Sequence, residues 1–371
     1  MTSLPNSRRA SPPMSADTQR APRSRDEVLR AAAHSQMHIE AAEAAEVVRR
    51  QLAANDSRAR ALGKALRHKP PRLVVTCARG SSDHAATYAK YLIETRLGVT
   101  TTSAAPSLSS IYAESNGAPD VLFLAISQSG RSPDLLNAAE RARRAGSTVL
   151  ALVNDEASPL VDLADVVLPL KAGPERSVAA TKSYIAALSA VHQLTAHWSQ
   201  RPDMIDSLAT VPDVLDAAWD CDWSGGLDGF TDARNLFVLG RGIGLGIAQE
   251  MALKFKETCG IHAEAFSTAE VRHGPMTIIG DGFPVLIIGQ PDETLDGVVQ
   301  TARELVARKA RVFCAGFDLP GAVTLPTVRT TAALQPLAAV QSFYRMTNAV
   351  AFARGLDPDR PPHLAKVTET L

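Results

Sequence analysis

The sequence predicts an α/β protein made of two tandem domains, each a parallel β-sheet flanked by helices. Short apolar segments alternate along the chain with longer helical patterns, a combination typical of parallel sheets. Part of this pattern occurs twice, at a constant separation in the sequence. The length of 371 residues also exceeds what a single compact core usually supports. Together these observations favour two similar domains in one chain.

The repeat is clearest at the ends of two predicted strands. One strand ends before Arg79 and a similar strand ends before Arg241, 162 positions later, and each is followed by glycine and an Ala-rich helix. The same separation relates the strand that ends at Ile126 to the strand that ends at Ile288. Two matches in one register indicate duplication. The predicted strands begin near Leu73, Val121, Val149, Asn235, Pro284 and Val312.

We expect the first domain to span 27–205 and the second to span 220–371. The preceding residues, 1–26, are rich in Ser, Pro and Arg and hold almost no large apolar side chain. They lack the apolar centre of a secretory signal and the periodicity of a transit peptide, so we expect a disordered extension. Met14 is an alternative start of the protein. An Ala-rich helical segment follows, with a predicted break at Asn55–Asp56.

Composition and charge exclude several classes of function. The 39 Lys and Arg residues balance the 39 Asp and Glu residues, whereas a nucleic-acid-binding surface needs a basic excess. No apolar run approaches the roughly 18 residues of a membrane span. The four cysteines are scattered and form no CxxC pair, which is typical of reduced thiols in a cytoplasmic protein. We therefore expect neither nucleic acid nor membrane as a partner.

Two loops of the first domain are candidates for anion binding. Ligands of open α/β sheets lie where the carboxyl ends of strands lead into helix N-termini. Hydroxyl groups, glycine and helix amides at such a point suit a phosphomonoester, although the same residues can simply cap helices. No Gly-Lys-Ser/Thr follows, so a nucleoside triphosphate is not implied. The candidate residues are Gly80, Ser81 and Ser82 in one loop and Ser127, Gln128, Ser129 and Ser132 in the other.

The corresponding loops of the second domain differ. Around Gln290 and Asp292 the hydroxyls are missing, so we expect only the first domain to bind phosphate. The glycine run from Gly240 to Gly246 lacks the Gly or Ala that dinucleotide binding requires at the last position of its motif. No dinucleotide cofactor is therefore expected.

A helix of the second domain carries charged residues on one face. Glu250, Lys254 and Glu257 are spaced i, i+4 and i+7, and the helix begins at the glycine-rich loop on the ligand side of the sheet. The alternative is an exposed ion pair worth about 0.3–0.5 kcal/mol. His273 precedes Gly-Pro and so lies on a turn rather than in a packed helix. The residues around Lys366 alone assign that lysine no role.

These segments together resemble the sugar isomerase (SIS) family. The chain is similar to the isomerase half of glucosamine-6-phosphate synthase and to stand-alone glucosamine-6-phosphate deaminases, over nearly everything after residue 35. The resemblance implies two SIS domains with flavodoxin-like sheets and a homodimer with sites near its interface. It rests on Ala78–Ser82, Ser127–Gly130, Val178–Lys182, Leu239–Gly242, Glu250–Glu257, His262–Ala265, Glu270–Pro275 and Leu364–Lys366.

The resemblance also implies roles for individual residues. Glu257 matches the carboxylate that moves a proton between C1 and C2, His273 the group that opens the sugar ring, and Lys366 the lysine that forms a Schiff base. Glu250 and Lys254 match residues that position the substrate. The phosphate loop corresponds to Ser82, Ser127, Gln128, Ser129 and Ser132. The sequence departs from the synthase at Ala180, where the synthase has a serine near the sugar.

The expected activity is that of a glucosamine-6-phosphate deaminase, which forms fructose 6-phosphate and ammonia without metal or cofactor. No cysteine precedes Cys77, so we expect no glutaminase domain to supply ammonia for synthesis. Alternatives with the same residues are a fructosamine-6-phosphate deglycase and a related amino-sugar-phosphate isomerase. A non-catalytic sugar-phosphate sensor is disfavoured by the joint presence of Glu257, His273 and Lys366.

Overall fold

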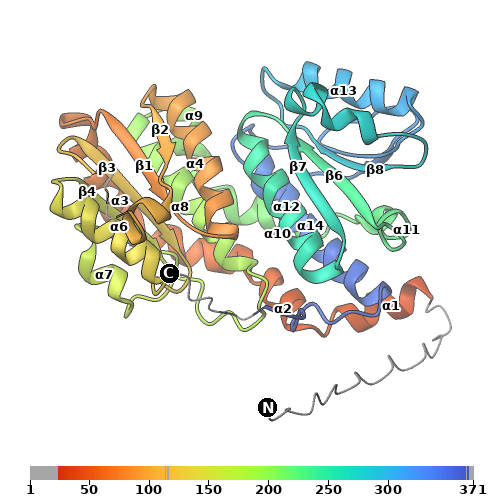
Figure 1. Ribbon diagram of the computed structural model, residues 1–371, viewed down its shortest axis with the longest axis horizontal. Helices are drawn as coiled ribbons and strands as arrows, with labels where there is room; N and C mark the ends of the chain where they lie inside the picture. The colour runs from red at the N-terminus through yellow and green to blue at the C-terminus, as the bar shows by residue number, and fades with distance from the viewer. Residues whose placement is uncertain (1–23, 113, 115–116, 365, 367–371) are drawn as a thin grey trace, which may run out of the picture.

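The computed structural model describes residues 24–112, 114, 117–364 and 366. Most of the predicted extension 1–26, including Met14, lies outside these residues. Figure 1 shows two lobes, each built around one sheet, with the first domain in orange to yellow-green and the second in cyan to blue. The lobes meet where α4 (Ser81–Leu97) and α8 (Lys182–Ser199) face α12 (Leu245–Cys259) and α14 (Gln335–Ala353).

The first sheet has five parallel strands in the order β2-β1-β3-β4-β5. Its central strand β3 is buried along its whole length, as expected for a strand covered by helices on both faces. The strand order is that of flavodoxin-like sheets. The strands are β1 (Leu73–Cys77), β2 (Thr101–Ser103), β3 (Val121–Ser127), β4 (Thr148–Val153) and β5 (Val166–Pro169).

The second sheet repeats the topology of the first. Its order, β10-β9-β8-β6-β7, becomes identical to that of the first sheet when β6 to β10 are matched to β1 to β5. All its neighbouring strands are parallel. The predicted fold class and the duplication are therefore confirmed. The strands are β6 (Asn235–Gly240), β7 (His262–Ser267), β8 (Pro284–Ile288), β9 (Arg311–Ala315) and β10 (Val323–Leu325).

Helices cover both sheets and join the two lobes. The N-terminal helices α1 and α2 pack against α14, although α14 follows the second sheet in the chain. None of the described helices is long and apolar enough to cross a membrane. The helices are α1 (Arg25–Ala32), α2 (Gln36–Ala42), α3 (Ala44–His68), α4 (Ser81–Leu97), α5 (Pro106–Ser110), α6 (Pro133–Arg144), α7 (Pro159–Leu163), α8 (Lys182–Ser199), α9 (Pro202–Leu208), α10 (Val211–Trp219), α11 (Leu227–Phe230), α12 (Leu245–Cys259), α13 (Leu295–Ala307) and α14 (Gln335–Ala353).

The predicted helix break at Asn55–Asp56 is wrong, because α3 continues through both residues. Asn55 is fully buried and its amide Nδ2 donates to the carbonyl of Pro169 at 2.9 Å, at the end of β5. Asp56 accepts from Arg60 one turn later, at 2.8 Å. The two polar side chains thus find partners outside their own backbone, and the helix has no reason to end there.

The glycine run of the second domain serves helix packing. A Cβ at Gly246 would lie 2.5 Å from the carbonyl oxygen of His84 and 3.0 Å from the amide nitrogen of Tyr88, both in α4. Glycine therefore allows α12 and α4 to approach backbone to backbone across the domain boundary. The hydrophobic core is continuous across this contact.

Replacing Gly246 by alanine should destabilise the protein by about 1–3 kcal/mol, the usual cost of overpacking a core contact. Gly297 is the control because it lies exposed in α13, where an added Cβ would have no neighbouring atom within 4 Å. Gly297→Ala should be neutral or stabilising by up to about 1 kcal/mol. Urea unfolding of both variants measures the difference. Equal free energies of unfolding for the two would contradict the proposed helix contact.

Candidate active site between the two domains

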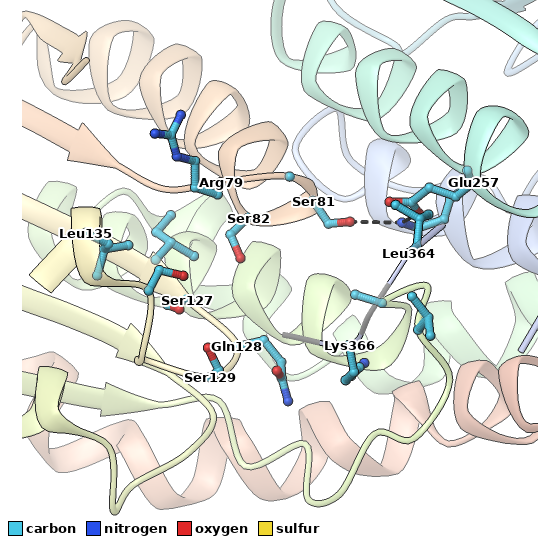
Figure 2. A pocket seen from close by; sticks show the side chains of 16 residues that line it. Arg79, Ser81, Ser82, Ser127, Gln128, Ser129, Leu135, Glu257, Leu364 and Lys366 are labelled. Atoms are coloured by element: carbon cyan, nitrogen blue, oxygen red, sulfur yellow. Dashed lines mark hydrogen bonds and ion pairs between the residues drawn. The ribbon is translucent and has the colours of Figure 1, made fainter. Parts of the chain in front are cut away.

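A cavity of about 320 Å³ lies between the carboxyl ends of the first sheet and α12 of the second domain. Figure 2 shows the serines of the β3–α6 loop at one end of the cavity and Glu257 at the other. Ten of the predicted site residues line it. They are Gly80, Ser81, Ser82, Ser127, Gln128, Ser129, Ser132, Lys254, Glu257 and Lys366.

The β3–α6 loop is folded by its own hydroxyl groups. Ser127 Oγ accepts from the amide of Gly130 at 2.9 Å, and Ser129 Oγ accepts from the amide of Arg131 at 3.4 Å. Ser132 occupies the N-cap of α6 but makes no side-chain capping bond. Its hydroxyl therefore stays available at the N-terminus of a helix, where an anion is favoured. Helix capping alone thus does not account for this serine.

Glycines shape both loops at this end of the cavity. Gly130 has φ +62°, and a Cβ there would lie 2.2 Å from Ser158 Oγ. Gly80, at the N-cap of α4, has φ 55° and ψ −133°, a region open only to glycine at low cost. Each loop can therefore turn tightly enough to bring its hydroxyls to the cavity.

In the second domain, the helix that corresponds to α6 is α13, and a carboxylate of the chain itself lies at its N-terminus. Asp292 Oδ1 accepts from the amide and the hydroxyl of Thr294, at 2.9 and 2.5 Å, just before α13. The side-chain amide Nε2 of Gln290 donates to the same carboxylate, at 3.1 Å from Oδ2. A second anion placed there would meet like charge. This arrangement supports the expectation that only the first domain binds phosphate.

Lys254 is the centre of a polar cluster at the other end of the cavity. Its ammonium Nζ lies 2.5 Å from Glu257 Oε2, 3.3 Å from Glu250 Oε1 and 3.0 Å from Ser81 Oγ. The dashed line from Ser81 in Figure 2 marks the last of these contacts, which joins the two domains. The side chain of Lys254 is 1% exposed. An exposed helix-surface pair, the alternative interpretation, is thereby excluded.

Glu250 lies behind Lys254 and does not line the cavity. Its fully buried carboxylate accepts from the hydroxyls of Tyr344 at 3.0 Å and Ser81 at 3.2 Å, and contacts His84 Nδ1 at 3.1 Å. Burial by itself would raise the pKa of Glu250, but Lys254 first, then His84 and Tyr344, reverse this and lower it. Glu250 is therefore ionised at neutral pH and acts on the cavity through Lys254 and Ser81.

Lys254 stays charged for the reciprocal reason. Burial would lower the pKa of its ammonium, but Glu250 and Glu257 together raise it. Glu257 is the partner that reaches the cavity, with a side chain 21% exposed. Of the two carboxylates beside Lys254, only Glu257 can therefore touch a substrate directly.

Lys366 enters the cavity from the C-terminal segment, which returns to the first domain. Its Nζ donates to the carbonyl of Ser177 at 2.6 Å and to Glu175 Oε2 at 3.2 Å. The side chain is 25% exposed, so it is not the freely solvated lysine that its position near the chain end suggests. Sequence reasoning missed Glu175, because no local pattern shows that a distant lysine will reach it.

Two further observations complete the site. Arg79, which served only to mark the repeat, lines the cavity and binds the buried carboxylate of Asp134, with Nε at 2.8 Å. The sequence feature that could have identified Arg79 as a site residue is its position directly before Gly80.

His273 lies exposed in the 3-10 turn Glu270–His273 and does not line the cavity of its own chain. Among the described residues, no cluster of three or more His, Cys, Asp or Glu side chains could hold a metal ion.

Comparison with known proteins defines the class. The SIS domain family matches residues 67–197 and 229–315, so the chain belongs to this family and contains two such domains. The isomerizing glutamine–fructose-6-phosphate aminotransferase of Methanothermobacter thermautotrophicus is 34% identical over 310 residues. That alignment covers 78% of this chain and 50% of the relative, so the chain spans about half the length of the curated relatives it matches.

Two solved structures are similar over most of the chain. A protein of Silicibacter pomeroyi DSS-3, provisionally described as a phosphosugar isomerase, is 39% identical with a TM-score of 0.84 and covers 88% of this chain and 100% of its own. The glucosamine-6-phosphate deaminase of Thermotoga maritima is 19% identical with a TM-score of 0.67, covering 87% and 100%. At that identity the second likeness shows the fold alone.

Lys254→Met should destabilise the protein by about 3–5 kcal/mol, because it leaves Glu250 buried without its cation. Lys171→Met is the control, since Lys171 pairs with Glu156 at 2.6 Å on the surface, where such pairs are worth about 0–1 kcal/mol. Thermal or urea unfolding at pH 7 measures both. If Lys254→Met lowered the free energy of unfolding no more than Lys171→Met, the buried ion cluster around Lys254 would be contradicted.

The same variant should change the dependence of stability on pH. In the wild type the lowered folded pKa of Glu250 contributes stability above the ordinary glutamate value of about 4.3, and this is lost as pH falls through the folded value. Without Lys254, burial dominates and raises that pKa, so the folded variant takes up the proton more readily. As pH falls from 7 toward about 4.3 the variant should recover stability, and below about 4.3 the wild type should lose it, so the difference in unfolding free energy between the two proteins should narrow throughout. A constant gap from pH 7 to pH 3.5 would show that Glu250 is not coupled to Lys254.

Proposed function

We propose that the protein is an amino-sugar-phosphate isomerase that converts glucosamine 6-phosphate into fructose 6-phosphate and ammonia. The observation that carries the proposal is one cavity with two chemically distinct ends. Hydroxyl-rich loops and a helix N-terminus stand at one end, and a carboxylate held against a buried ammonium stands at the other. Its volume of about 320 Å³ suits a small molecule rather than a polymer.

The phosphate group would be the anchor of the substrate. Ser82, Ser127, Ser129 and Ser132 offer hydroxyls at the first-domain end of the cavity. Binding energy from this remote, unreactive group can hold the carbons that react in a fixed orientation. The sugar would then extend from the phosphate toward α12, with C1 and C2 near Glu257.

Glu257 would move the proton between the two carbons. In the open-chain aldehyde its carboxylate removes the proton from C2, which gives an enolamine, and returns a proton to C1. The product is the imine of fructose 6-phosphate at C2. Lys254, held charged by its two carboxylates, can stabilise the oxygen on C1 as negative charge develops there.

Lys366 would act on the imine. Its amine, once neutral, attacks C2 and displaces ammonia, and water then hydrolyses the resulting Schiff base to fructose 6-phosphate and the free lysine. The position of Nζ at the cavity wall supports this role. Each bond that forms at C2 is matched by one that breaks, and no oxidant or reductant is needed.

Ring opening is assigned to His273 of a second copy of the chain. His273 is exposed and does not line the cavity of its own chain, so it could serve the chemistry only from a neighbouring protomer. We therefore propose a homodimer in which each site receives this histidine from the partner copy. Ala180 and Val178, which line the cavity, would shape the part that contacts the sugar.

Glu257→Gln should lower the rate of ammonia release from glucosamine 6-phosphate by about 10²–10⁴-fold, the usual contribution of a general base. Substrate binding should persist because the phosphate loops are untouched. Glu264→Gln, an exposed change on β7, is the control and should leave the rate unchanged. A coupled assay for fructose 6-phosphate measures turnover, and calorimetry measures binding.

The same assay separates the alternatives. Turnover of fructoselysine 6-phosphate but not of glucosamine 6-phosphate would favour a deglycase, and turnover of another amino-sugar phosphate would favour a related isomerase. Tight sugar-phosphate binding with no turnover of any of them would favour a sensor. Each of these three outcomes would overturn the deaminase assignment.

Mixing two inactive variants tests the source of the histidine. If His273 acts across the dimer, unfolding and refolding a mixture of Glu257→Gln and His273→Asn chains should restore about a quarter of the wild-type sites, because half the dimers are mixed and each holds one intact site. Either variant alone should stay inactive. No recovery in a mixture that contains mixed dimers, verified by native mass spectrometry, would place both residues in one chain's site.

A further inference from the structure

Glu175 is a buried carboxylate next to the cavity that the chemistry above does not use. It lies in the loop between β5 and α8, its side chain is fully buried, and it does not line the cavity. Oε2 accepts from the hydroxyl of Ser183 at 2.6 Å, and Oε1 accepts from the amides of Thr181 and Ser183 at 2.9 and 3.2 Å. The cation beside it is Lys366, with Nζ at 3.2 Å.

This carboxylate needs Lys366. Burying a charge is costly unless it is paired and hydrogen-bonded. Burial would raise the pKa of Glu175, but Lys366 first, then the donors of Ser183 and Thr181, reverse the effect and lower it. Glu175 is thus ionised at neutral pH and fixes the ammonium group of Lys366 by charge as well as by a hydrogen bond.

The loop that carries Glu175 is itself held from behind. Glu40, a buried residue of α2, accepts from the amides of Arg176 and Ser177, at 2.5 and 3.1 Å. The carbonyl of the same Ser177 is the second acceptor of Lys366 Nζ, at 2.6 Å. An ammonium has three donors, so two acceptors on one braced loop leave one N–H, whose proton Lys366 must lose before its amine can attack C2.

We propose that Glu175 is a positioning residue that holds Lys366 Nζ at the wall of the cavity. It acts through Lys366, and it does not contact the substrate. The proposal rests on the proposed function, because it assumes that Lys366 takes part in turnover. It explains how Lys366, which lies 197 positions after the end of β5 at Pro169, is set in a defined place in the first domain.

A double-mutant cycle tests this role directly. Glu175→Gln keeps the shape and the acceptor oxygen but removes the charge, and it should lower kcat about 10–100-fold while KM changes less than about threefold. In a Lys366→Ala background Glu175→Gln should not lower kcat further, because the lysine through which Glu175 acts is no longer present. Glu46→Gln, which removes an exposed carboxylate of α3 away from the cavity, is the control and should leave kcat unchanged in both backgrounds. A Glu175→Gln effect that is equally large in both backgrounds would overturn the proposal.

Chemical modification gives a readout that does not depend on turnover. In Glu175→Gln, acetylation of Lys366 by acetic anhydride, followed by peptide mass spectrometry, should be at least about fivefold faster than in the wild type. Lys64, which is exposed in α3, is the internal standard and should react at one rate in both proteins. An unchanged rate at Lys366 would refute the contact. Absence of turnover in the wild type, together with faster acetylation of Lys366 in Glu175→Gln, would refute the proposed function alone.

A third comparison covers the case in which Glu175→Gln does not fold by itself. Lys366→Met leaves Glu175 buried without its cation and should lower Tm. The double variant removes the charge as well, so it should melt above Lys366→Met. A double variant that melts below Lys366→Met would show that the two side chains do not depend on each other.

Discussion

The structure depends on the contact of Lys254 with two carboxylates of its own helix and with a hydroxyl of the other domain. A buried ammonium needs close partners, and here Glu250, Glu257 and Ser81 supply them within 3.3 Å. Ser81 begins α4 and Lys254 lies in α12, so the cluster is complete only when the two lobes meet. Gly246 makes this approach possible at the level of the backbone. Domain packing and site assembly therefore share one set of contacts.

Duplication has left two sheets of one topology with different strand-end chemistry. In the first domain, Ser132 stands at a helix N-terminus without capping it. In the second, the matching residue is Thr294, and its amide and hydroxyl are already taken by the carboxylate of Asp292. The first domain thus offers the hydroxyls and the helix N-terminus of the proposed anion site, while the second contributes the charged face of α12. One site built from two unequal copies explains why a neutral protein can bind an anionic ligand: a single helix end and a few hydroxyls suffice, and no basic surface is required.

Sequence patterns predicted the parts whose causes are local. The buried central strands are continuous apolar runs, and the loop residues follow them directly, so β1, β3 and the serine loops were foreseeable. The short edge strands β2, β5, β7 and β10 were not, because their residues are few or partly exposed; His262 and Glu264 of β7 face solvent. The helix break predicted at Asn55 was wrong for a related reason: the hydrogen-bond partner of its side chain lies in β5, far away in the sequence. Glu175 and Tyr344 enter the site through contacts between distant segments, which no spacing rule reveals.

The measurement that tests the account most directly is a crystal structure of Glu257→Gln with glucosamine 6-phosphate. Phosphate oxygens should lie within about 3 Å of the hydroxyls of Ser82, Ser127 and Ser132. C1 and C2 should lie within about 3–3.5 Å of the side chain of residue 257. A phosphate bound at the α12 end, or a sugar bound outside this cavity, would contradict the division of the site between the two domains.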